Sequence, residues 1–225
     1  MFGEMKDIPP NLGAISKAAE LCHLNVFGLA SPEAEDPVPK GTRSIVLLGP
    51  HEPGFWLHVS REPEFLEPLP DPLDRWSTRI ITVLASDFGG TAVFPFGGPP
   101  YAPFTAWALR SGRAWSSPVK LLVHDTAGLM VSYRGAIALP FAIESPVPGP
   151  QPCDTCVGQP CLAACPVSAL TSSGYDLKAC HGFLDTPEGQ NCMQQGCAVR
   201  RICPISQTYP RLPAQSAHHM KAFHQ

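Results

Sequence analysis

The distribution of cysteine is the feature that most restricts how this chain can fold. Eight of the nine cysteines lie between Cys153 and Cys203, within 51 of the 225 residues, and the ninth, Cys22, lies far from them. A dense run of thiols indicates either a disulfide framework or a metal site. The chain therefore divides into a thiol-poor N-terminal part and a thiol-rich remainder.

The compartment decides between these two readings. Residues 1–10 mix acidic and basic side chains and contain no apolar run of signal-peptide length. No stretch approaches the roughly 20 apolar residues that cross a bilayer. We therefore expect a cytoplasmic protein without a membrane partner, in which clustered cysteines bind metal rather than form disulfides. The net charge of -3 gives no reason to expect a nucleic-acid partner.

The spacing of the cysteines indicates which metal. The first block, Cys153 to Pro166, reads C-x2-C-x4-C-x3-C-P, and a looser second block ends in Cys203-Pro204. The bacterial ferredoxin run is C-x2-C-x2-C-x3-C-P, and in two-cluster proteins its fourth cysteine binds the other cluster. The proline after that cysteine helps to prevent its loop from continuing as a helix. The pattern predicts two [4Fe-4S] clusters.

A crossed assignment of the ligands follows from the ferredoxin pattern. Cluster 1 takes Cys153, Cys156, Cys161 and Cys203. Cluster 2 takes Cys165, Cys180, Cys192 and Cys197. The four-residue gap before Cys161 and the irregular second block depart from the ferredoxin spacing. Two zinc ions with four cysteines each are the alternative, although zinc does not explain the two Cys-Pro endings. Cys22 is interpreted as a small buried hydrophobic residue.

The thiol-poor part predicts an α+β fold, a mixed α/β domain with one sheet over residues 1–145. Apolar periodicity predicts helices over 11–24, 73–88 and 103–111. Apolar runs predict strands over 25–30, 43–49, 91–96, 119–124, 128–133 and 135–143. Asp125-Thr126-Ala127 is expected to join two of these strands as a hairpin. Residues 144–152, with four prolines, predict an extended linker, followed by a small ferredoxin-like module over 153–209 and a tail over 210–225.

Several polar residues near the cysteines have two interpretations. Arg200 and Arg201 are interpreted as a solvated basic pair, with charge compensation for a cluster or docking of a donor as the alternative. The tail is interpreted as a helix that packs Met220 and Phe223 on the core and leaves its histidines in solvent. A metal or axial ligand site at these histidines is the alternative. His181 either tunes cluster 2 or lies on the surface. The tail histidines are His218, His219 and His224.

The chain resembles the epoxyqueuosine reductases and, more distantly, the reductive dehalogenases, over roughly Ala14 to Pro204. The resemblance rests on the cysteine pattern after a Pro-rich linker and on the stretches 110–112, 120–124 and 128–135. It implies a corrinoid-binding α/β domain followed by a ferredoxin-like module with two [4Fe-4S] clusters. Those reductases carry an acidic residue before the third predicted helix. Here residues 96–103 contain no carboxylate, so no catalytic residue is predicted.

These features predict an iron–sulfur electron-transfer protein. The two clusters would relay single electrons from a ferredoxin- or flavodoxin-type donor to a cofactor or partner at the N-terminal domain, the acceptor being unidentified. One alternative is a corrinoid-dependent reductase or cobalamin-reducing enzyme related to epoxyqueuosine reductase. Another is a non-catalytic ferredoxin-like subunit whose N-terminal domain serves only in docking.

Overall fold

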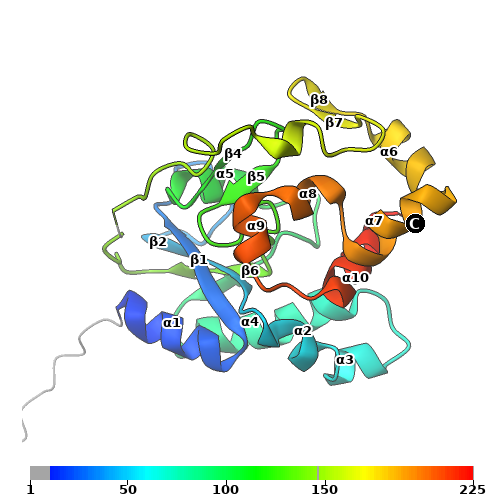
Figure 1. Ribbon diagram of the computed structural model, residues 1–225. Coiled ribbons are helices and arrows are strands. Elements are labelled where there is room, and N and C mark those ends of the chain that lie inside the picture. The colour runs from blue at the N-terminus through cyan, green and yellow to red at the C-terminus, as the bar shows by residue number, and fades with distance from the viewer. Residues whose placement is uncertain (1–10, 146, 225) are drawn as a thin grey trace, which may run out of the picture.

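The computed structural model describes residues 11–145 and 147–224 and has the mixed α+β architecture that the sequence predicts (Figure 1). Residues 1–10, where no signal peptide was expected, and Pro146 of the expected linker lie outside the described residues. Within the described residues, no helix combines the length and the apolar character that crossing a membrane requires.

One four-stranded antiparallel sheet organises the N-terminal part, with strand order β1-β2-β6-β3. Its central strand β2 is a continuous apolar run and is buried along its whole length, as expected for a strand covered on both faces. The strands are β1 (Leu24–Ala30), β2 (Ser44–Pro50), β3 (Thr91–Val93) and β6 (Gly135–Leu139).

Helices cover both faces of this sheet (Figure 1). Val46 and Leu48 pack with α1, α2 and α4, while Ile45 and Leu47 pack with α5, because alternate side chains of a strand point to opposite faces. The short helices α2 and α3 were not predicted, whereas the three predicted helices are present. The bounds are α1 (Leu12–Leu21), α2 (Gly54–Val59), α3 (Pro63–Leu66), α4 (Pro72–Asp87) and α5 (Phe104–Arg110).

The predicted hairpin around Asp125 is wrong. Strand β5 (Leu122–His124) pairs antiparallel with β4 (Ala114–Ser116), which precedes it in the chain. Residues 128–133, the expected partner, form no strand. The His124 and Gly128 backbones exchange two hydrogen bonds of 3.0 and 2.9 Å, which closes a tight turn. The chain then binds α9 (Pro204–Thr208), where the Leu129 N–H donates to Ser206 Oγ at 2.9 Å. A side chain at Gly128 would lie 2.5 Å from the Ser206 nitrogen, so only glycine fits this contact.

The cysteine-rich part consists of short helices and one small hairpin, as expected for a segment interrupted by prolines. Its core is continuous with the N-terminal part, since Val123 and Leu129 pack against Leu170 and Val199. The elements are η1 (Pro160–Leu162), β7 (Leu170–Thr171), β8 (Gly174–Tyr175), α6 (Leu177–Leu184), η2 (Pro187–Gly189), α7 (Gln190–Gln195), α8 (Ala198–Ile202), α9 and α10 (Pro213–Phe223).

The tail forms helix α10, which packs against α7 and closes the gap between the cysteine-rich part and α2 and α3 (Figure 1). The expectation that its histidines lie in solvent is wrong. His218 packs between the rings of Trp56 and Phe65, with centroid distances of 5.1 and 5.5 Å. The α10 helix therefore buries its polar face as well, because the two parts of the chain meet on either side of it.

Candidate metal centres

The structure gathers the eight clustered cysteines into two separate groups of four, each lining its own cavity. Site 1 is lined by Cys153, Cys156, Cys161 and Cys203. Site 2 is lined by Cys165, Cys180, Cys192 and Cys197. Each group therefore contains one cysteine from the other sequence block, which is the crossed arrangement on which the ligand assignment was based. None of the nine cysteines forms a disulfide.

The crossed arrangement depends on the positions of Cys203 and Cys165, each of which lies apart from the other cysteines of its sequence block. Cys203 lies between α8 and α9, and α8 packs beside η1, which carries Cys161. Pro204 occupies the first position of α9, where its missing N–H costs nothing, and it separates α9 from α8. Cys165 follows η1 and turns towards α6 and α7, which carry Cys180 and Cys192.

Site 1 is small and its wall is uncharged. Besides the cysteines, the described residues that line it are Ser117, Pro118, Val123, Leu129, Gln159, Pro160 and Pro204, and the cavity measures about 20 Å³. That volume is close to what a single water needs. Burial, followed by the neighbouring Cys161, Cys203 and Cys156 thiols, raises the pKa of Cys153 to about 11. The Cys153 thiol is therefore protonated in the free protein, and it must ionise before it can bind a metal.

Site 2 encloses about 240 Å³, so it has room for a group of several atoms. Its sulfurs already accept hydrogen bonds. The Tyr175 hydroxyl donates to Cys180 Sγ at 3.2 Å, and the Ala169 N–H donates to Cys165 Sγ at 3.2 Å. Donors of this kind stabilise thiolate and tune the potential of a cluster that thiolates hold.

Two arginines lie in the wall of site 2. Arg200 donates to the Leu129 carbonyl, and Arg211 Nη1 donates to the Met130 carbonyl at 2.8 Å. Burial lowers the pKa of Arg211 to about 10, and the charge of Arg200 adds to this shift. Both guanidinium groups remain charged at neutral pH, so site 2 has two positive charges beside its four sulfurs.

The interpretation of Arg200 and Arg201 as a solvated pair is wrong for Arg200. Burial lowers the pKa of Arg200 and the neighbouring Cys197 raises it, and both residues line the site 2 cavity. Arg201 instead points away, where it donates to the Gly196 carbonyl at 2.9 Å and to the Asn191 side chain. Sequence spacing could have separated them, because adjacent residues on a helix lie on different faces.

The tail histidines contribute to site 2 without forming a metal site of their own. His219 lines the cavity, and burial, followed by the charge of Arg211, lowers its pKa well below the ordinary value, so it is neutral. His224 Nδ1 lies 2.7 Å from His181 Nδ1, and its other ring nitrogen lies 3.0 Å from Asp185. This pair fixes the end of α10 to α6, the helix that carries Cys180.

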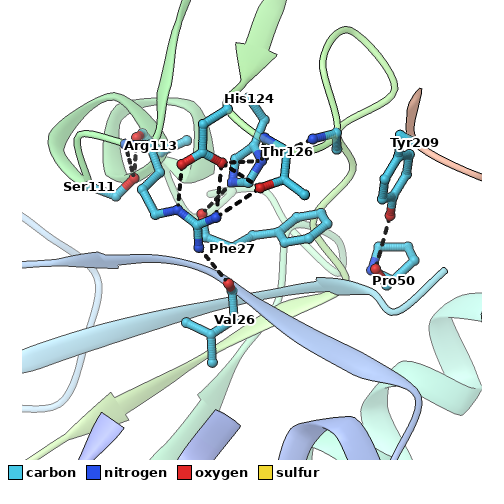
Figure 2. A network of polar contacts seen from close by, with 11 residues as sticks. Val26, Phe27, Pro50, Ser111, Arg113, His124, Thr126 and Tyr209 are labelled. Atoms are coloured by element: carbon cyan, nitrogen blue, oxygen red, sulfur yellow. Dashed lines mark hydrogen bonds and ion pairs between the residues drawn. The ribbon is translucent and has the colours of Figure 1, made fainter. Parts of the chain in front are cut away.

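His124 and Asp125 belong to a structural network rather than to a catalytic one (Figure 2). Burial lowers the pKa of His124 to about 4, and its Nε2 lies 2.8 Å from the Phe27 carbonyl. A neutral ring that donates from Nε2 also accepts the Thr126 N–H at Nδ1, at 3.1 Å. Arg113 pairs with Asp125 and donates to the Val26 carbonyl at 2.8 Å. The network fixes the turn after β5 to β1.

Within residues 11–145 and 147–224, no three His, Cys, Asp or Glu side chains are arranged to hold a metal ion directly. Cys22 ends α1 as a free thiol that is only partly buried, unlike the buried position that the sequence predicts, and burial followed by Asp87 raises its pKa. Sequence reasoning missed the contributions of Tyr175, Arg211 and the segment 129–132 to the sites. Only the fold brings Arg211 and the segment 129–132 to the cysteines, whereas Tyr175 lies five residues before Cys180.

Comparison of the chain with protein-family models, with curated proteins and with solved structures finds no match. The corrinoid and the relation to epoxyqueuosine reductases therefore stay predictions of the sequence resemblance alone. The two four-cysteine cavities, which come from the fold itself, are the features on which a function can be argued.

Proposed function

We propose that this protein transfers single electrons through two [4Fe-4S] clusters, held by the cysteines of site 1 and site 2 in a ferredoxin-like arrangement. The observation that carries the proposal is that eight cysteines from two irregular sequence blocks sort into two cavities of four. Such clusters, when bound, supply reversible one-electron chemistry. Four thiols per site match their ligand count.

The size of site 2 favours an iron–sulfur group over zinc. Four sulfurs bound to zinc at about 2.3 Å lie only about 3.8 Å apart around one ion. The four cysteines of site 2 instead lie, together with twenty other residues, in the wall of a cavity of about 240 Å³, whereas the site 1 cavity measures about 20 Å³. Apolar side chains such as Leu170 and Phe183 and the N–H donor of Ala169 complete a wall that limits solvent and binds sulfur.

The charges beside the two sites support a direction of electron transfer. Positive charge beside a cluster stabilises its reduced form, so Arg200 and Arg211 favour reduction at site 2. The loop beside site 1 reaches solvent at Val157, whose side chain is 96% exposed. Electrons from a ferredoxin- or flavodoxin-type donor would therefore enter at site 1 and move to site 2.

Anaerobic purification followed by iron, sulfide and zinc analysis tests the proposal. Two intact clusters give about eight irons and eight sulfides per chain. The reduced protein should then show the electron paramagnetic resonance of two interacting clusters. Zinc at about two ions per chain, with neither iron nor sulfide, would replace the proposal with the zinc alternative.

A further inference from the structure

Glu52 is a buried carboxylate without a partner. It follows β2 and precedes α2, and only 8% of its surface is exposed. Neither of its carboxylate oxygens has accessible surface or a hydrogen-bond partner among the described residues. An ionised carboxylate in such a place is strongly unfavourable, because it has lost its hydration and gained no compensating hydrogen bond.

Polar groups from the far end of the chain surround this carboxylate. Gln215 of α10, which is 0% exposed, lies beside it, but both of its amide atoms stay outside hydrogen-bonding geometry. Arg211 faces Glu52 from the segment before α10, and Tyr209 faces it from the end of α9. The Tyr209 hydroxyl is engaged, since it donates to the Pro50 carbonyl at 2.9 Å (Figure 2).

These surroundings leave Glu52 able to change its charge near neutral pH. Burial raises its pKa to about 7, although the Gln215 amide and the charge of Arg211 act in the opposite direction. Burial raises the pKa of Tyr209 above its ordinary value, so this hydroxyl stays neutral. Arg211 stays positive. Of the groups that face one another here, Glu52 is thus the one that titrates in the physiological range.

Arg211 connects Glu52 to site 2. Its side chain lines the site 2 cavity, and the same guanidinium faces the carboxylate, while its Nε has no hydrogen-bond partner among the described residues. A negative charge that arrives at site 2 therefore competes with the Glu52 carboxylate for the same positive charge. Placing both negative charges around one arginine in a buried region is unfavourable.

We propose that Glu52 takes up one proton when site 2 accepts one electron. The inference rests on the proposed function. The electron comes from the ferredoxin- or flavodoxin-type donor, which is oxidised, and the proton comes from solvent. The only bond that forms is the O–H bond of the Glu52 carboxylic acid. The buried charge therefore stays constant during reduction, and the proton is released when the electron leaves.

The test is the pH dependence of the two midpoint potentials in the purified, iron-loaded protein between pH 6 and 8.5. Reduction at site 2 should become less favourable as the pH rises, by up to tenfold per pH unit or about 59 mV for one electron. In Glu52→Gln this dependence should disappear, and the site 1 potential should not change with pH in either protein. Glu64→Gln is the matched control, since Glu64 is 7% exposed but is paired with Arg79. It should keep the wild-type dependence.

A second readout does not depend on the variant. The infrared difference spectrum of wild type, reduced minus oxidised at pH 7.5, should gain a carboxylic acid band that shifts when glutamate is labelled with ¹³C. Two clusters with a pH-independent site 2 potential and no such band would overturn this inference and leave the proposed function standing. A protein that binds no iron would overturn both.

Discussion

Site 1 and site 2 each gather four cysteines, but the fold surrounds them differently. No charged side chain of the described residues lines site 1, and the acidic Asp154 follows its first cysteine. The wall of site 2 contains Arg200 and Arg211, and its sulfurs accept hydrogen bonds from Tyr175 and Ala169. The same ligand set can therefore hold clusters of different potential, because charge and hydrogen bonds near the sulfurs set that potential.

The largest expected effect concerns the two cysteines that line the site of the other sequence block, Cys165 and Cys203. Cys165→Ala should empty site 2 although Cys165 belongs to the first sequence block, and Cys203→Ala should empty site 1 although it belongs to the second. Each variant should lose about four of eight irons, because a four-iron cluster needs all its thiolates. Iron and sulfide analysis with electron paramagnetic resonance would measure this.

Electron paramagnetic resonance spectra of the variants test whether the cysteines group in the crossed arrangement. Cys165→Ala should give the same residual spectrum as Cys192→Ala, and Cys203→Ala the same as Cys156→Ala. Cys22→Ala is the control and should keep both clusters. If Cys165→Ala instead matched Cys156→Ala, each site would be formed from a single sequence block.

The second effect concerns the free energy of unfolding and arises from Glu52, which faces Arg211 in the wall of site 2. The pKa of Glu52 is raised from 4.5 to about 7 in the folded protein. The folded state then retains a proton that the unfolded state has lost, so stability falls as the pH rises from 4.5 to about 7. Glu52→Gln removes this loss and should be more stable than wild type by about 3 kcal/mol at pH 8. Denaturant unfolding at pH 4 and pH 8 measures it.

Glu64→Gln is expected to change the stability at pH 8 in the opposite direction. Hydrogen bonds from Arg79 lower the pKa of Glu64, so its ionised form stabilises the fold above the unfolded pKa and that stability is lost as the pH falls. Its variant should therefore be less stable than wild type at pH 8. Equal stabilities of wild type and Glu52→Gln at pH 8 would contradict the raised pKa of Glu52.

The third effect concerns the charge of Arg200. Arg200→Met keeps most of the apolar stem and removes the positive charge beside Cys197. A unit charge several ångströms away contributes about 2 kcal/mol at an effective dielectric constant near 20, which corresponds to roughly 90 mV for one electron. The site 2 potential should fall by about that amount, and the site 1 potential should change much less.

Two variants control this measurement. Arg201→Met removes a charge from the neighbouring residue, whose guanidinium binds Asn191 and the Gly196 carbonyl. It should leave both potentials close to wild type. Arg200→Lys keeps the charge and should restore most of the potential. Equal shifts in the Arg200 and Arg201 variants would mean that overall charge matters and the wall of site 2 does not.

The smallest effect concerns the hydroxyl of Tyr175. Tyr175→Phe removes the donor to Cys180 Sγ and nothing else. Because a hydrogen bond to an ionised group contributes about 1.5 kcal/mol, the site 2 potential should fall by up to roughly 60 mV. A redox titration would show this fall with site 1 unchanged. An unchanged site 2 potential would show that the Tyr175 hydroxyl does not act on the cluster.

Much of the N-terminal fold follows from local sequence patterns. The apolar periods of α1 and α4 and the apolar run of β2 predicted these elements close to their positions. The hairpin after His124 failed for a physical reason. The Leu129 and Met130 carbonyls bind Arg200 and Arg211 from the far end of the chain, so neither carbonyl is free to bind a strand partner.

By itself, the sequence determined the cysteine content, the two blocks and the crossed grouping, because short spacings and Cys-Pro endings restrict where each thiol can point. Only the tertiary structure decided what surrounds each group. Glu52 lies far from Arg200 and Arg211 in the chain, and their charges interact because α10 and the segment 129–132 bury them together. Burial removes water from these charges, and local sequence patterns do not report burial that arises from long-range packing.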